Sequence, residues 1–222
     1  MTILGGGVYS LTEAARLTQL RASRVRDWFR SEAGEPSGSS VFRSDYPAIA
    51  GEKAISFLDL IEVCVAGKLR AANPPVSLQH IRKVHRKLAG DTGQKHPFCT
   101  KDIYHSGGKI FTKRIDDRET ETVIEALTDQ IYIDEFIIPF LNKIEYNEIT
   151  SLANLWRIAD GVVVDPTRCF GKPIVEEVGI TTRVLASAFE ANGRDAYRVA
   201  DWFGIESIHV QAAVNFELRP AA

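Results

Sequence analysis

The first thirty residues constrain the fold most, because they read as two short amphipathic helices separated by a tight turn. Ser10 and Glu13 form a capping-box pattern, which predicts a helix over residues 11–18. The helical pattern breaks at 19–21, and a second helix is predicted over 22–30. The side chains expected to be buried on the second helix are Ala22, Val25 and either Trp28 or Phe29. Two helices of this length with a three-residue turn have the proportions of a helix-turn-helix.

The second of these helices is strongly basic. Its side chains expected to contact nucleic acid are Arg21, Ser23, Arg24, Arg26 and Arg30. Arginine is suited to meeting both guanine edges and phosphates, and a helix N-terminus offers free N–H groups to an anion. Helix pairs of this size also occur as plain corners of a core, which is the alternative interpretation. The density of arginine favours DNA binding.

Charge is divided unevenly along the chain. Residues 1–114 contain 18 Lys+Arg and 10 Asp+Glu, a net charge of +8, whereas residues 115–222 contain 9 and 19, a net charge of −10. A basic half attracts a polyanion through counterion release, and an acidic half repels it. This division predicts two tasks, DNA binding in the first half and docking of a basic partner in the second. The alternative is two domains with ordinary solvated surfaces.

The remaining patterns predict a mainly α protein with small β elements, an α+β fold. Two extended pieces, 41–47 and 53–57, have the size of a β-wing. Further along the chain, two helices are predicted to begin at Ser56 and Ser77, and the second of them is predicted to end at Gly90. A hairpin is predicted over 102–114, a strand over 119–127, and a helix from Asp129 that bends at Pro139. Two more strands are predicted over 154–158 and 161–166.

Three short helices are predicted at the C-terminus, within residues 181–218. The second and third again have helix-turn-helix spacing, but the third has no arginine or lysine before Arg219. That composition favours a protein-interaction domain over a second DNA reader. The predicted organisation is a winged helix-turn-helix domain over 1–114, a connecting segment over 115–160 and a three-helix domain over 161–222.

Neither catalysis nor a metal site is predicted. The chain lacks the GxSxG, GxxxxGK[ST] and HExxH patterns. His96 and Cys99 are spaced as H-x-x-C, but no second close pair completes a tetrahedral zinc set. A hydrolase that uses Cys169 or a His–Asp pair is therefore disfavoured, and we expect no catalytic residues, metal or cofactor.

The cysteines and the hydropathy of the chain indicate its expected cellular location. The three cysteines, Cys64, Cys99 and Cys169, are far apart, which suits reduced thiols in a bacterial cytoplasm. No apolar run reaches the length of a membrane span, so no membrane association is expected.

The N-terminal runs YSLTEAARLTQLRASRVRDWF, SFLDLIEVCVAGKLR and VSLQHIRKVHRKL resemble the winged helix-turn-helix of MerR-type regulators. The runs GVVVDPTRCFGKPIVEEVGITTRVLASAFEANG, VADWFGI and VQAAVNFE are more specific. They resemble VapB-like antitoxins that carry a C-terminal domain of unknown function built from homeodomain-like helices. The resemblance covers nearly the whole chain and is loose between residues 99 and 149.

This resemblance implies a type II antitoxin that binds its own operator, represses its own transcription and neutralises a PIN-like ribonuclease toxin. It places Arg43 and Lys53 on the wing, and we expect a homodimer on an inverted repeat. The alternative is a MerR-like transcription regulator without a toxin partner. Because a ribonuclease presents basic surface to RNA, the residues expected to bind the partner are Glu176, Glu177 and Glu206.

Overall fold

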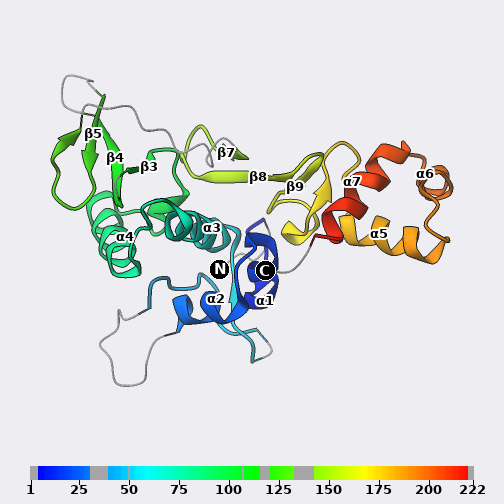
Figure 1. Cartoon of the computed structure of the whole chain (residues 1–222), viewed down its shortest axis with the longest axis horizontal. Coiled ribbons are helices and arrows are strands. Elements are labelled where there is room, and N and C mark those ends of the chain that lie inside the picture. Colours follow the sequence, from blue (N-terminus) through cyan, green and yellow to red (C-terminus); the bar gives the residue numbers. More distant parts are fainter. Residues whose placement is uncertain are drawn as a thin grey trace.

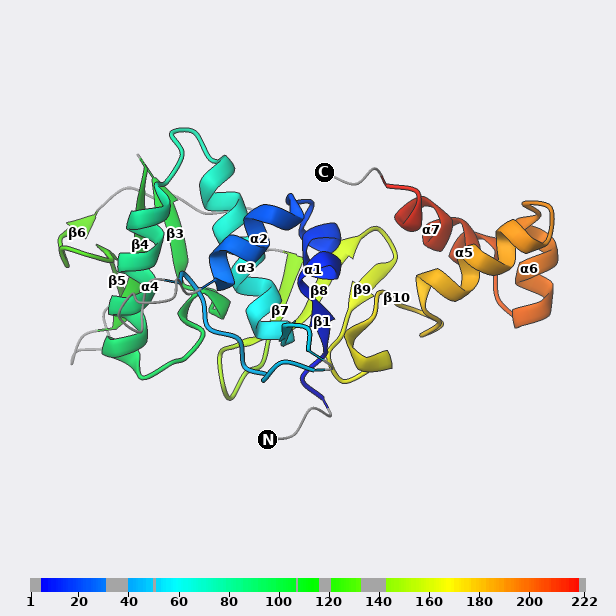
Figure 2. The ribbon, with the colours of Figure 1, turned by 90° about the horizontal axis from the view of Figure 1, so that it is seen from below.

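A computed structural model describes residues 5–30, 40–49, 51–106, 108–115, 121–132 and 143–219. The molecule is elongated, with one small sheet at one end, a three-helix unit at the other, and the N-terminal helices between them (Figures 1 and 2). Helices alternate with short antiparallel sheets, which confirms the predicted α+β class.

The predicted helix pair is present. Strand β1 (Tyr9–Ser10) leads directly into α1 (Leu11–Thr18), and α2 (Ala22–Phe29) follows after a short turn. The Ser10 hydroxyl accepts a hydrogen bond from the backbone N–H of Glu13 at 3.1 Å. The predicted capping box is only half formed, because the Glu13 carboxylate pairs with Lys172 instead, at 2.7 and 2.8 Å.

The segment after α2 contains less strand than the wing prediction required. Strand β2 (Ala54–Ile55) pairs with β1, and an isolated bridge joins Ile49 to Glu52. The first predicted piece, 41–47, forms no strand. The backbone N–H groups of Val41 and Phe42 instead donate to the carbonyl of Trp28, at 3.0 and 3.1 Å. Wing residues are therefore held by helix α2 rather than by a hairpin.

Helix α3 (Phe57–Ala71) forms the centre of the N-terminal core and is buried on nearly every side. Helix α4 (Leu78–Thr92) begins at Ser77, as predicted. The predicted stop at Gly90 is wrong: the helix continues for two more residues, and Gly93 ends it with a φ of 68°. Glycine adopts that left-handed conformation without the steric cost that a Cβ brings.

The sheet at the end of the molecule has the strand order β3-β4-β5-β6, all antiparallel. Its strands are β3 (Ile103–Ser106), β4 (Lys109–Ile115), β5 (Glu121–Glu125) and β6 (Ile131–Tyr132), preceded by the short helix η1 (Pro97–Cys99). The predicted hairpin and the strand after it are confirmed. The helix predicted from Asp129 is wrong at residues 131–132, which form strand β6. Pro139 lies outside the described residues.

A second antiparallel sheet has the order β10-β9-β8-β7 and leads to the three-helix unit. Its strands are β7 (Ile144–Tyr146), β8 (Ala153–Ala159), β9 (Val162–Val164) and β10 (Ile174–Val175), with the short helix η3 (Cys169–Gly171) before β10. The helices are α5 (Thr182–Ala191), α6 (Ala196–Phe203) and α7 (Ser207–Glu217). All three agree with the prediction.

Buried apolar side chains form two clusters among the described residues. The larger joins the helix-turn-helix, α3 and α4 to strands β8 and β9, and the smaller lies inside the three-helix unit. Contacts also cross from β1 and α1 to the C-terminal part: Tyr9 donates to the Gly171 carbonyl at 2.8 Å, and Arg16 pairs with Glu217 at 3.1 Å. Residues beyond 114 thus complete the core under the helix-turn-helix, so experiments on this motif need the full chain.

No helix in the described ranges is both long and apolar enough to cross a membrane.

Candidate nucleic-acid interface

Helix α2 has one buried face and one exposed face, which carries the basic residues together with Asp27, whose Oδ1 lies 3.7 Å from the guanidinium of Arg30. Val25, Trp28 and Phe29 point into the core, and the last two are each 2% exposed. The residues predicted to meet DNA are all exposed, namely Arg21, Ser23, Arg24, Arg26 and Arg30. The structure thus brings these five residues together on the outer face of a single helix and at its two ends.

The N-terminus of α2 is open to an anion. Arg21 occupies the N-cap position, and within the described part of the chain no side chain caps the helix there. The first backbone N–H groups of a helix lack intrahelical partners and carry the positive end of its dipole. A DNA phosphate placed there would accept those hydrogen bonds while the flanking arginines supply charge.

The two predicted wing residues differ in their surroundings. Arg43 is exposed and lies next to the Val41–Phe42 segment that hydrogen bonds to α2. The Lys53 ammonium instead donates to the carbonyl of Phe29 at 2.6 Å, at the C-terminus of α2. That contact satisfies a terminal carbonyl and complements the helix dipole. Lys53 therefore holds the C-terminus of α2, and Arg43 is the predicted wing residue that stays exposed.

The three glutamates predicted to bind a partner separate into two places. Glu176 pairs with Arg157, which also pairs with Glu145. Glu177 and Glu206 instead line one groove of about 610 Å³ between the β8–β9 turn and α7. The Glu177 side chain is 79% exposed and lies 3.5 Å from the Nε2 of His209. Two of the three predicted residues therefore share a surface.

The acidic charge of the second half is concentrated before the three-helix unit. Residues 115–164 contain 3 Lys+Arg and 11 Asp+Glu, whereas residues 165–222 contain 6 and 8. The net charges are −8 and −2. The groove still gathers the carboxylates of Asp160, Glu177 and Glu206 against one guanidinium, that of Arg219, and α7 itself has no lysine or arginine. The groove is therefore the place in the C-terminal part where a basic partner would meet several carboxylates together.

Large apolar side chains on α6 are a feature that the sequence analysis missed. Tyr197 is 79% exposed and Trp202 66%, and Ile208 at the start of α7 is also 66% exposed. Helix α6 buries only small side chains, those of Val199 and Ala200, while its large aromatic side chains face outward. Large apolar side chains exposed on one small unit are a feature of protein-interaction surfaces.

A buried polar cluster lies beneath the wing segment. The Glu62 carboxylate, 2% exposed, accepts from the Nε2 of His85 at 2.8 Å, and it lies 3.3 Å from the Nδ1 of His96. Burial alone would raise the pKa of Glu62, but the hydrogen bonds from the two histidines lower it overall. Asp45 and Asp59 complete the surroundings of His96. Sequence spacing gave no signal for this cluster.

Comparisons with known proteins agree with the fold. Residues 162–216, from β9 into α7, match the family described as "Protein of unknown function (DUF433)". The chain is similar to the crystal structure of Rv2018 from Mycobacterium tuberculosis, with a TM-score of 0.66 and 21% sequence identity, over 93% of this chain and 96% of that one. No curated protein matches.

These comparisons define an α+β fold shared over nearly the whole chain, with a DUF433-like segment at its C-terminal end. They name neither a MerR-type domain nor an antitoxin. The resemblance to VapB-like antitoxins therefore stays a prediction.

Proposed function

We propose that the protein is a non-enzymatic DNA-binding regulator that reads its operator with helix α2. The observation that carries the proposal is the outward basic face of α2, set in a helix-turn-helix whose opposite face is buried in the core. In proteins that use this motif, the second helix lies in the major groove and its N-terminal residues contact base edges. Arg24 and Arg26 are in that position, whereas Arg21 and Arg43 flank it.

Binding should depend strongly on salt. If about four of the basic residues neutralise phosphates, the slope of log K against log salt is about −3.6, and affinity falls roughly 10²-fold between 50 and 200 mM salt. The measurement is a fluorescence-anisotropy titration of the full chain with the duplex upstream of its own gene, repeated at several salt concentrations. Absence of binding at 50 mM salt would contradict the proposal.

We further propose that the DNA-bound protein is an antitoxin and that its partner is a PIN-like ribonuclease encoded beside it. The groove contains three carboxylates, Asp160, Glu177 and Glu206, and one guanidinium, Arg219, so it offers a net negative charge to the basic surface with which such an enzyme holds RNA. The exposed side chains of Tyr197 and Trp202 supply apolar surface in the same three-helix unit. Charge complementarity would guide the encounter, and apolar contact would hold the complex.

Charge reversal in the groove tests the partner site. The double variant Glu177→Lys, Glu206→Lys is expected to bind the purified ribonuclease about 10-fold more weakly, mainly through slower association that is screened by salt. The matched control is Glu148→Lys with Glu190→Lys, which changes the charge equally at two exposed positions outside the groove. Surface plasmon resonance would report both rates. Equal losses in the two double variants would mean that net charge, not the groove, matters.

The alternative, a MerR-like regulator without a toxin partner, predicts a different result when the full chain is tested with its operator and with the neighbouring ribonuclease. In that case the full chain binds its operator, but the ribonuclease encoded beside it does not co-purify with it after co-expression.

A further inference from the structure

Three segments of the chain bring metal-binding side chains together beneath the wing. Asp45 follows the segment held by α2, Asp59 lies in the first turn of α3, and His96 precedes η1. The Nε2 of His96 lies 3.0 Å from Asp45 Oδ2, and its Nδ1 lies 3.9 Å from Asp59 Oδ1. One donor atom from each residue can be chosen so that all three lie within 4.8 Å of one another.

Asp59 supplies a second, independent observation. Its side chain is fully buried, and its Oδ2 accepts hydrogen bonds from the backbone N–H groups of Ser56 and Asp45 at 2.9 and 3.0 Å. Its Oδ1 faces His96 and has no hydrogen-bond partner among the described residues. An unpaired buried carboxylate oxygen is costly, and a bound cation removes that cost.

The charge balance points the same way. Around His96 stand the carboxylates of Asp45, Asp59 and Glu62. The Lys95 ammonium pairs with Asp45, and His85 pairs with Glu62. Among the ion pairs described for these three carboxylates, Lys95 is the one lysine or arginine. Buried carboxylates are retained in proteins when they are paired or coordinate a metal.

We propose that Asp45, Asp59 and His96 bind one divalent transition-metal ion, with Zn²⁺ as the best match. Zinc accepts imidazole nitrogen and carboxylate oxygen, each at about 2.0–2.2 Å, whereas Mg²⁺ prefers oxygen ligands alone. Glu62, 3.3 Å from the Nδ1 of His96, is placed to orient the imidazole.

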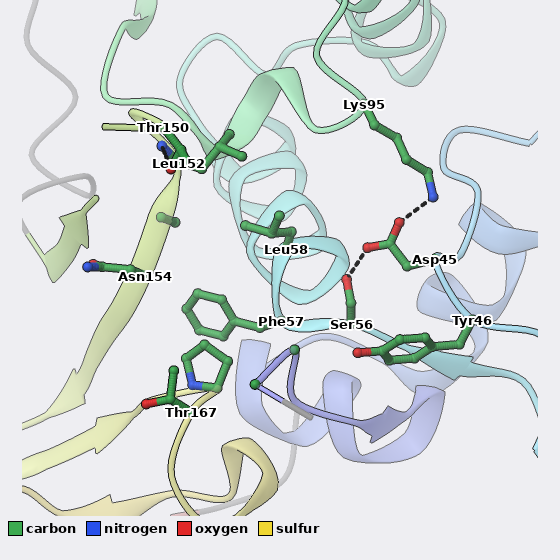
Figure 3. A pocket seen from close by; sticks show the side chains of 14 residues that line it. Asp45, Tyr46, Ser56, Phe57, Leu58, Lys95, Thr150, Leu152, Asn154 and Thr167 are labelled. Carbon is green, nitrogen blue, oxygen red and sulfur yellow. Dashed lines mark hydrogen bonds and ion pairs between the residues drawn. The ribbon is translucent and has the colours of Figure 1, made fainter. Parts of the chain in front are cut away.

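The donor spacing permits this coordination after a small adjustment. Ligand atoms on one zinc ion lie about 3–4 Å apart, so the outermost pair here must close by about 1–2 Å. Asp45 can supply the movement, because its side chain is 22% exposed and its partner Lys95 is 56% exposed. Figure 3 shows Asp45 between Lys95 and Ser56 at the edge of a pocket of about 590 Å³. Of the three proposed ligands, Asp45 is the one that lines this pocket, so an ion would approach the site from the side of Asp45.

The site would join the wing segment to the core. A Zn²⁺ ion that binds the folded state and not the unfolded state stabilises the folded protein. A Zn²⁺ concentration 100 times the Kd is expected to raise Tm by about 5–10 °C. This stabilisation requires no DNA or protein partner, so its failure is distinguishable from a failure of the proposed regulatory function.

The test is calorimetric titration of ZnCl₂ into the EDTA-treated full chain, with MgCl₂ in parallel. We expect one Zn²⁺ per chain at micromolar Kd or tighter, no Mg²⁺ binding at the same concentrations, and the rise in Tm. Asp45→Asn and His96→Gln should each weaken Zn²⁺ binding at least 10-fold. Asp45 lies outside the helices, so its variant keeps the test valid if His96→Gln fails to fold.

Two control variants remove other potential zinc ligands. Cys169 is an exposed thiol and His209 lies in the C-terminal groove, so Cys169→Ser and His209→Gln should leave binding unchanged. The proposal is overturned if no stoichiometric Zn²⁺ binding occurs, if Asp45→Asn binds Zn²⁺ like the parent chain, or if either control variant abolishes binding.

Discussion

Replacement of both Arg24 and Arg26 by alanine is expected to weaken operator binding by about 1–3 kcal/mol for each arginine that meets a base edge. Both side chains are exposed on α2, one turn or less from its N-terminus, and neither has a protein acceptor among the interactions described for this helix. Their loss should leave the fold unchanged, because the buried face of α2 is carried by Val25, Trp28 and Phe29. No other single helix should show a comparable sensitivity.

The matched control is Arg183→Ala with Arg198→Ala, which removes the same charge from exposed positions on α5 and α6. Titrations with the operator duplex and with a scrambled duplex separate the two kinds of contact. Loss of specificity indicates base contacts, whereas a shallower salt slope with unchanged base preference indicates phosphate contacts. If the control pair weakens binding and the α2 pair does not, the three-helix unit is the DNA reader.

Local signals in the sequence predicted the helices well. Ser10, Ser56 and Ser77 each cap a helix that begins at the next residue. The glycine pair at 107–108 correctly predicted a hairpin, since Ser106 pairs with Lys109 across it. Such signals act within a few residues, so they can be read without knowledge of the tertiary structure.

The errors arose where distant partners override local preference. Glu13 has the spacing of a capping box, but Lys172 from the other end of the chain captures its carboxylate. The apolar run after Asp129 has mixed periodicity, and its described ends are strands because β5 and β8 offer them hydrogen-bonding edges. Short apolar runs do not distinguish helix from strand by periodicity alone.

The candidate sites show the same division. The basic residues of α2 could be predicted because they share one short helix. The groove was predicted only in part, because Glu176 pairs with Arg157 whereas Glu177 lies beside His209. The cluster around His96 could not be predicted, because β2 separates Asp45 from Asp59 in the sequence, and most of α3 and all of α4 separate Asp59 from His96. Single carboxylates at such spacings occur throughout the chain and carry no local signature.

Replacement of Trp28 by alanine should have the largest effect on stability, about 3–5 kcal/mol of unfolding free energy. Trp28 is 2% exposed and packs edge-on against Phe42, with ring centroids 6.2 Å apart. Its carbonyl also accepts from the N–H groups of Val41 and Phe42, so the cavity would loosen the wing segment together with α2. Operator affinity should fall as well, although Trp28 does not face solvent.

Trp202→Ala is the matched control, because it makes the same substitution at a side chain that is 66% exposed on α6. Its cost in unfolding free energy should be about 0.5 kcal/mol or less. Urea titration followed by circular dichroism measures both variants without relying on tryptophan fluorescence. If Trp28→Ala is as stable as Trp202→Ala yet binds the operator poorly, Trp28 contacts DNA directly and does not serve as the core anchor of the recognition helix.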